Sequence, residues 1–218
     1  MLAGGLEWAD PTDLDGLREA LKLADPENRL APIGMSRVEI GRRALDLLPE
    51  VVSELASGPR VVLVMDPTPM RRGDDDLKAE VERLLAEHFD LGRAVIGEGR
   101  AALHADERAL DEATAALTGA DCVVVVGSGT ITDLCKEATA RVGAPPLVVV
   151  QTAASVNAFS DDMAVLLRAG TKRTVPSRWP DALLVEIPVL ACAPRRGSGR
   201  WSPRSRPRPR GGRSRAAT

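Results

Sequence analysis

The chain has 218 residues, enough for one large or two small domains, and its hydrophobic fraction of 44% is ordinary for a globular core. With three Trp, two Phe and no Tyr, it is poorly equipped to stack on nucleic-acid bases. Residues 195–218 contain nine Arg and no Asp, Glu or Lys, so the whole-chain charge of −2 leaves −11 on residues 1–194, which argues against a nucleic-acid-binding body.

The three cysteines, Cys122, Cys135 and Cys192, are odd in number and have no Cys-x-x-Cys spacing, which favours neither a disulfide framework nor a zinc site. We expect Cys122 and Cys135 in the core. Residues 1–7 lack a basic region followed by an apolar one, and no apolar run approaches the ~20 residues that span a bilayer. These features predict a cytoplasmic protein without a membrane partner.

The chain up to residue 150 shows helix and strand patterns in alternation. A short amphipathic helix is predicted over 13–23, a strand over 37–41 and a helix over 44–55, which Pro49 bends or divides. Later elements follow in order: strand 60–65, helix 74–89 with an acidic first turn, strand 93–96, helix 106–117, strand 121–126, helix 130–142 and strand 147–150.

The stretch 121–136 is the centre of this pattern. Four consecutive valines predict a strand buried on both faces. Gly127 and Gly129 are expected to let the backbone turn sharply and a ligand approach, with Ser128, Thr130 and the first helical amides facing an anion. The stretch lacks the P-loop Gly-Lys-Ser/Thr and the third Rossmann glycine, so a tight turn without a ligand is the alternative.

Alternation from residue 60 to 150 predicts right-handed crossovers, a parallel sheet and helices on both faces. Ligands bind such sheets at the carboxyl ends of the strands. Three polar groups follow predicted strands there: Asp66, the turn at Gly127, and the segment 151–162. We therefore expect one ligand cleft along this edge.

Asp66 stands where an acid would bind the hydroxyls of an adenosine ribose. A carboxylate there repels a 2′-phosphate and favours NAD, although Arg71 and Arg72 could restore NADP binding. The alternative is that Asp66 only forms a turn before Pro67.

After residue 150 the strand and helix patterns no longer alternate. Residues 163–168 and 171–175 predict two strands around a tight turn, and 182–187 a further strand.

Together, three stretches resemble sn-glycerol-1-phosphate dehydrogenase, within the superfamily of iron-type alcohol dehydrogenases, glycerol dehydrogenase and 3-dehydroquinate synthase. They are the turn 127–133, the stretch Gln151-Thr152-Ala153-Ala154-Ser155, and the hairpin with Lys172-Arg173-Thr174.

The resemblance, which covers roughly residues 33–190, implies a role for each matching position. The turn Gly127, Ser128, Gly129, Thr130, with Asp133 behind it, matches the pyrophosphate-binding loop, and Asp66 the ribose-binding acid. Thr152 and Ser155 match residues beside the nicotinamide. Asn157 stands where the family has an Asp near substrate and metal, and Ser160 or Asp161 where it has a further cofactor contact.

The chemistry implied is hydride transfer between NAD(P)H and dihydroxyacetone phosphate, with a divalent metal (Zn, Ni or Fe) polarising the carbonyl. The family's metal ligands, an Asp and two His, come from a following helical domain, which we expect to be absent here. The two histidines, His88 and His104, are predicted to be surface residues rather than ligands. No catalytic or metal residue is predicted in this chain.

We expect an N-terminal helical extension over 1–32, an NAD(P)-binding α/β domain over 33–190 and a disordered Arg/Pro-rich tail over 191–218. The tail is either the product of a shifted reading frame or a basic arm for nucleic acid or an acidic partner.

Three functions remain open: a dehydrogenase of this type retaining cofactor binding only, a non-catalytic nucleotide-binding module or partner subunit, and a dehydroquinate-synthase-like lyase. Apolar surface around the 155–190 hairpin predicts homo-oligomers or self-association.

Overall fold

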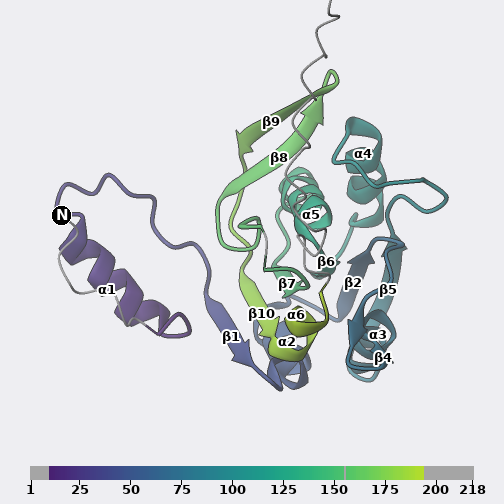
Figure 1. Ribbon diagram of the computed structural model, residues 1–218, viewed down its shortest axis with the longest axis horizontal. Coiled ribbons are helices and arrows are strands. Elements are labelled where there is room, and N and C mark those ends of the chain that lie inside the picture. The colour runs from purple at the N-terminus through teal and green to yellow at the C-terminus, as the bar shows by residue number, and fades with distance from the viewer. Residues whose placement is uncertain (1–9, 155, 194–218) are drawn as a thin grey trace, which may run out of the picture.

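The computed structural model describes residues 10–154 and 156–193. Figure 1 shows a central sheet with helices on both sides. The six strands are all parallel and lie in the order β1-β10-β7-β6-β2-β5. Their bounds are β1 (Arg37–Gly41), β2 (Arg60–Met65), β5 (Asp90–Val95), β6 (Cys122–Gly127), β7 (Leu147–Gln151) and β10 (Ala182–Glu186). The predicted Rossmann-like parallel sheet is confirmed.

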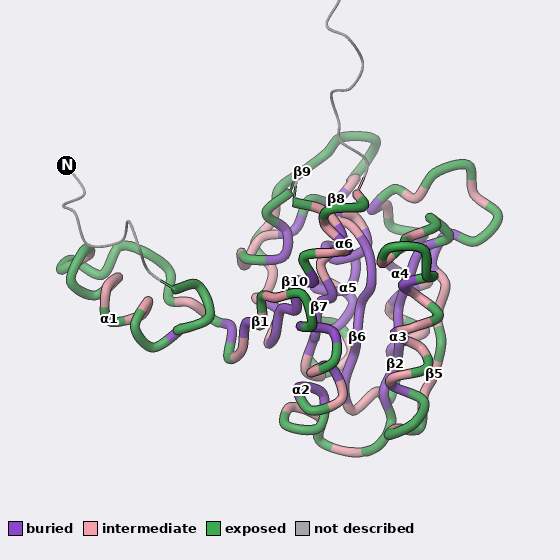
Figure 2. Tube along the Cα trace, turned by 60° about the horizontal axis from the view of Figure 1, so that its bottom comes forward, coloured by how far each residue is buried: buried purple, intermediate pink, exposed green. Residues whose placement is uncertain are grey.

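Strand β6 separates two hydrophobic cores. All of its residues are buried, as the valine run predicted, and Figure 2 shows the buried chain concentrated in the sheet. Val123 and Val125 pack on one face, and Val124 and Val126 on the other. The first face is covered by α4 (Glu107–Ala116), α5 (Gly129–Arg141) and the hairpin β8 (Met163–Arg168) and β9 (Thr171–Pro176); the second by η1 (Ala44–Leu47), α2 (Leu48–Leu55), α3 (Leu77–Ala86) and α6 (Ile187–Cys192).

Helix α1 (Leu14–Ala24) confirms the predicted N-terminal helix and lies beyond β1 in Figure 1. The Asp13 carboxylate accepts a hydrogen bond from the Gly16 amide and caps the helix. Leu14 is buried, and the Arg18 guanidinium donates to the Met35 carbonyl at 2.6 Å. The helix is therefore joined to the chain just before β1.

The helix over 44–55 is divided, one of the two effects expected of Pro49: a 3₁₀ turn ends at Leu47, and α2 carries Pro49 in its first turn, where proline's missing N–H costs no hydrogen bond. The helix over 74–89 was predicted too long and spans only Leu77–Ala86. It starts late because Asp76 caps it, while β4 (Asp75–Asp76) pairs with β3 (Arg71–Arg72).

The remaining elements follow the predicted order with shifted ends. Strand β5 begins at Asp90 rather than 93, and β10 ends at Glu186 because α6 starts with Ile187 and has Pro188 in its first turn. Helix α6 was not predicted, and it crosses the expected boundary at residue 190. The tail from 194 onward lies outside the described residues, and the domain boundaries stay predictions.

The cysteines in the sheet and in α5 are core residues, as predicted. Burial raises the pKa of the Cys122 thiol to about 12 and also raises that of Cys135. Cys192, at the end of α6, is exposed. None of the helices that the structure describes is both long and apolar enough to cross a membrane.

The dependence of the fold on the sheet can be tested at Leu63 of β2, which has no exposed surface. We expect Leu63→Ala to lower the free energy of unfolding by about 2–5 kcal/mol, because it leaves a cavity in a packed core. Leu23→Ala on α1, where the side chain is 85% exposed, is the control and should stay within about 0.5 kcal/mol. Urea denaturation measures both, and equal effects would contradict the assigned core.

Candidate functional site

The carboxyl ends of three strands meet at one edge of the sheet. Met65 of β2 pairs with Val126 of β6, and Gly127 pairs with Gln151 of β7. The chain passes from β2 out to β5, then returns past β2 to β6 and continues to β7 and β10. Strand order therefore reverses between β2 and β6, which is where α/β sheets bind ligands.

Asp66, the turn at Gly127 and Thr152 directly follow these three adjacent strands. The prediction that three polar strand ends share one edge is confirmed.

The N-terminus of α5 differs from those of α1, α3 and α4. An aspartate carboxylate caps each of those three helices, whereas the Ser128 side chain makes no cap hydrogen bond to α5. Instead, the amide and hydroxyl of Thr132 both donate to the Ser128 carbonyl, at 3.2 and 3.1 Å. Among the described residues, no side chain caps the first-turn amides of α5, and such amides favour an anion.

The two glycines of this turn serve a purpose other than the predicted one. Neither Gly127 nor Gly129 has a positive φ, so the expected conformational role is wrong. A Cβ on Gly127 would lie 2.2 Å from Cγ2 of Ile131, and one on Gly129 would lie 3.1 Å from Cγ2 of Val156. The chain's own side chains approach these glycines closely, and this contact explains the small residues without a ligand.

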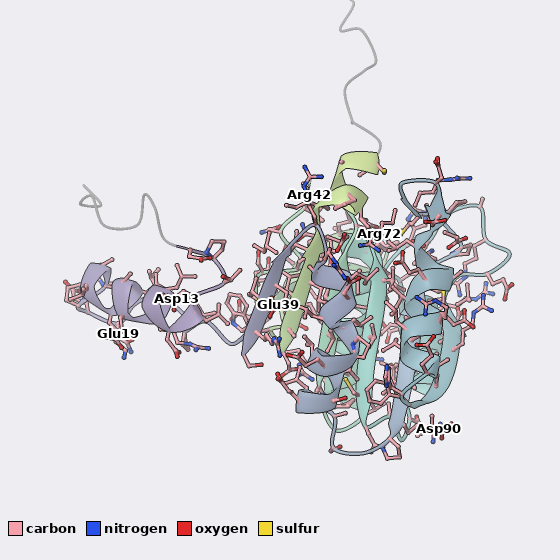
Figure 3. All side chains as sticks on the ribbon, turned by 90° about the horizontal axis from the view of Figure 1, so that it is seen from below. Asp13, Glu19, Glu39, Arg42, Arg72 and Asp90 are labelled. Carbon is pink, nitrogen blue, oxygen red and sulfur yellow. The ribbon has the colours of Figure 1, made fainter. Side chains whose placement is uncertain are left out.

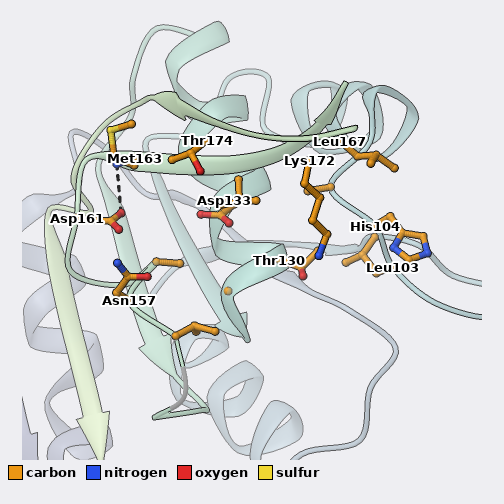
Figure 4. Close-up of a pocket in the computed structure, with 15 residues that line it drawn as sticks. Leu103, His104, Thr130, Asp133, Asn157, Asp161, Met163, Leu167, Lys172 and Thr174 are labelled. Atoms are coloured by element: carbon orange, nitrogen blue, oxygen red, sulfur yellow. Dashed lines mark hydrogen bonds between the residues drawn. The ribbon is translucent and has the colours of Figure 1, made fainter. Parts of the chain in front are cut away.

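A cavity of about 440 Å³ opens between the start of α5 and the β8–β9 hairpin (Figure 4). Four predicted site residues line it: Gly129, Thr130, Asp133 and Asn157. The other lining residues are Leu103, His104, Ala105, Val156, Ala158, Asp161, Met163, Val165, Leu167, Lys172 and Thr174. The structure thus joins α5, the segment after β7 and the hairpin in one site.

Asp133 is the buried carboxyl of this cavity, with 5% of its surface exposed. Burial raises its pKa to about 6, and the charge of Asp161 adds to this effect. A hydrogen bond from the Val165 amide and the charge of Lys136 lower the pKa only in part. Asp133 is therefore a carboxyl whose ionisation in the cavity is costly near neutral pH.

Lys136 was missed by the sequence reasoning, although it is fully buried. Its ammonium donates to the carboxylate and carbonyl of Asp161, both at 2.8 Å, and to the carbonyls of Ala158, at 3.2 Å, and Met163. These bonds tie the segment after β7 to α5, and they position the wall that carries Asn157. Nothing in an amphipathic helix pattern distinguishes such a lysine from a surface one.

Two further predicted cofactor residues, Thr152 and Ser160, do not line the cavity. Thr152 is 7% exposed, at the end of β7. Ser160 is exposed in a turn in which its amide donates to the Asn157 carbonyl at 2.9 Å. Asp161, the alternative position, does line the cavity. Ser155 lies outside the described residues.

Asp66 is 7% exposed, and both of its carboxylate oxygens are engaged. Oδ1 accepts from the Thr68 amide at 3.1 Å and from the Lys78 ammonium at 2.8 Å, while Oδ2 accepts from the Thr68 hydroxyl at 3.2 Å. The turn-forming role that was considered for Asp66 is therefore present. Its position at the reversal of strand order also suits the ribose-binding role.

Arg72 is bound to two carboxylates, one of them buried. Its guanidinium bonds Glu186, at 3.0 Å, and Glu80, at 2.6 Å, and Glu186 is fully buried. Figure 3 shows Arg72 and Arg42 at one end of the sheet and Asp90 at the other. The neighbouring Arg71 donates to the Asp74 carbonyl at 3.0 Å. The expectation that Arg72 assists NADP binding is not supported, because its charge is already balanced.

Both histidines are exposed, as predicted, yet His104 also lines the cavity. Within residues 10–154 and 156–193, no group of three or more His, Cys, Asp or Glu side chains could hold a metal ion. These residues therefore do not fit a catalytic metal. The exposed apolar side chains Val156, Val165 and Ile187 lie around the hairpin and α6, where self-association was expected and stays a prediction.

A parallel sheet whose strand order reverses at the edge beside the start of α5 defines a Rossmann-like α/β fold. The chain belongs to the iron-containing alcohol dehydrogenase family, whose model matches residues 39–194. The likeness expected from the turn, the Gln151 stretch and the hairpin is therefore confirmed.

Curated relatives include glycerol-1-phosphate dehydrogenase [NAD(P)+] of Bacillus subtilis, 32% identical over 75% of this chain and 41% of the relative. The enzyme of the same name from Pyrococcus furiosus is 29% identical over 73% of this chain and 43% of the relative. The chain thus spans about four-tenths of the length of these relatives.

Solved structures share the fold. A probable glycerol dehydrogenase from Sinorhizobium meliloti has a TM-score of 0.56 at 22% identity, covering 72% of this chain and 40% of that one. An archaeal halo-thermophilic alcohol dehydrogenase from the Red Sea brine pool has a TM-score of 0.64 at 15% identity, covering 74% and 47%.

The raised pKa of Asp133 predicts a pH-dependent loss of folding stability. Because the folded-state pKa of about 6 exceeds the ordinary aspartate value of 3.8, the native state binds more protons than the unfolded state between these values. This loss of stability is absent below that pH range, grows as pH rises through it, and is complete above it. Asp133→Asn should therefore gain stability relative to the wild type by about 2–3 kcal/mol from pH 4 to pH 7.

Urea denaturation at a series of pH values measures this difference, with the exposed Asp90→Asn as control. A constant difference between Asp133→Asn and the wild type across this range would show that Asp133 does not cause this loss of stability.

Proposed function

We propose that this chain holds NAD(P) along the carboxyl edge of its sheet, as the cofactor-binding part of an oxidoreductase of the glycerol-1-phosphate dehydrogenase type. The observation that carries the proposal is the meeting of Asp66, the uncapped start of α5 and Thr152 at three adjacent strand ends. The curated relatives named glycerol-1-phosphate dehydrogenase [NAD(P)+] support it.

In this proposal the cofactor crosses the edge from β2 to β7. The adenosine ribose lies at Asp66, and the pyrophosphate lies against the amides from Gly127 to Thr130. The nicotinamide half extends past Thr152 toward the cavity, which Asp133 and Asn157 line. Ser155 and Ser160 remain proposed contacts from the segment after β7.

The reaction proposed for the family type is hydride transfer between NAD(P)H and dihydroxyacetone phosphate, with Asn157 offering its amide to the substrate. Carbonyl polarisation by a divalent metal is not assigned to this chain, because the described residues do not fit one. What the described residues supply is binding and orientation of the cofactor.

A non-catalytic nucleotide-binding module or partner subunit is the second candidate, favoured by the same lack of a metal-ligand cluster among the described residues. A dehydroquinate-synthase-like lyase is less well supported, since the curated relatives cited above carry the dehydrogenase name.

Cofactor binding is tested by titrating the chain with NADH and following nicotinamide fluorescence. Asp66→Ala removes the ribose acceptor, and Gly129→Val fills space beside the α5 amides, so each should weaken binding at least about tenfold. Gly41→Val is a control, because a Cβ there finds no atom closer than 3.9 Å and β1 lies at the sheet edge. If neither site variant weakens binding, the cofactor assignment fails.

Turnover by the purified chain is a separate test. With NADH, dihydroxyacetone phosphate and added Ni²⁺ or Zn²⁺, we expect no metal-dependent loss of NADH absorbance, because the described residues present no cluster of metal ligands. A relative from the same family serves as the positive control. Clear metal-dependent turnover would refute a role limited to cofactor binding.

A further inference from the structure

The acid at the end of β2 carries its own counter-ion. Lys78, in the first turn of α3, reaches back to the strand end, and its ammonium lies 2.8 Å from Oδ1 of Asp66. Only 12% of the lysine side chain and 8% of the aspartate side chain are exposed. The pair is therefore shielded from solvent, where the attraction between opposite charges is stronger than at an open surface.

We propose that Lys78 determines cofactor specificity by neutralising Asp66, so that the site accepts NADPH as well as NADH. The inference rests on the proposed function, since it concerns the ribose end of the same cleft. An unpaired carboxylate at this position repels a 2′-phosphate. Beside Lys78, the carboxylate is part of an ion pair with zero net charge, so its repulsion of a 2′-phosphate is offset.

The geometry keeps the ammonium in this position. Besides the carboxylate, it donates to the backbone carbonyls of Asp66 and of Thr68, the latter at 2.6 Å. All three ammonium protons thus have acceptors at the strand end, so the lysine is not free to swing away. Its charge acts on the ribose site from a fixed position.

The arginines of the following hairpin do not supply this charge. Arg72 is balanced by the buried Glu186 and by Glu80, and Arg71 is exposed with its guanidinium bonded to the Asp74 carbonyl. Lys78 is the cation that the structure places directly on Asp66.

The test compares dissociation constants for NADH and NADPH in the full-length chain, measured by nicotinamide fluorescence. In Lys78→Met the carboxylate loses its counter-ion, so NADPH binding should weaken at least about tenfold relative to NADH. Lys78→Arg retains the charge and should keep the ratio close to that of the wild type. Lys22→Met on α1, whose side chain is 72% exposed, is the matched control.

Asp66→Asn provides the reverse test if Lys78→Met unfolds. It leaves the ammonium without its anion, and the ratio should shift at least about tenfold toward NADPH. Binding of both cofactors with a ratio unchanged in the folded variants would overturn the role of Lys78 while leaving the proposed cofactor site intact. A wild-type chain that binds neither cofactor would overturn the proposed function, and the role of Lys78 with it.

Discussion

The complete burial of β6 is the constraint on which the other parts of the structure depend. A strand with apolar side chains on both faces requires cover on both sides, and α4, α5 and the hairpin supply one side while η1, α2, α3 and α6 supply the other. The helix connections that provide this cover also make the strands parallel. Parallel pairing then places the ends of β2, β6 and β7 side by side.

Buried charges fix the loops at this edge. Lys136 ties the segment after β7 to α5, Arg72 joins the β3–β4 hairpin to Glu186 at the end of β10, and Lys78 holds Asp66. Removing one partner of such a pair leaves an uncompensated buried charge, which costs about 3–5 kcal/mol. Lys136, Arg72 and Lys78 thus fix the positions of polar groups that the sheet alone would not fix.

The turn at Gly127 combines two requirements. Positions 127 and 129 require glycine because Ile131 and Val156 approach them closely. The helix that follows lacks a capping side chain among the described residues. The first requirement concerns packing within the chain, and the second suits an anion. The two together explain why the motif is neither a P-loop nor the Rossmann pattern and is still compatible with the proposed cofactor site.

The sequence alone determined the order of the main-sheet strands and of the larger helices, because buried strands and amphipathic helices have distinct periodicities that need no tertiary context. It also placed Asp66, the turn at Gly127 and the segment 151–162 at strand ends, since strand bounds follow from the apolar runs. Only the tertiary structure decided which charges are already paired. Lys78 and Arg72 look alike in sequence as cations near Asp66, but their partners come from different elements, so folding alone assigns Arg72 to Glu186 and Lys78 to Asp66.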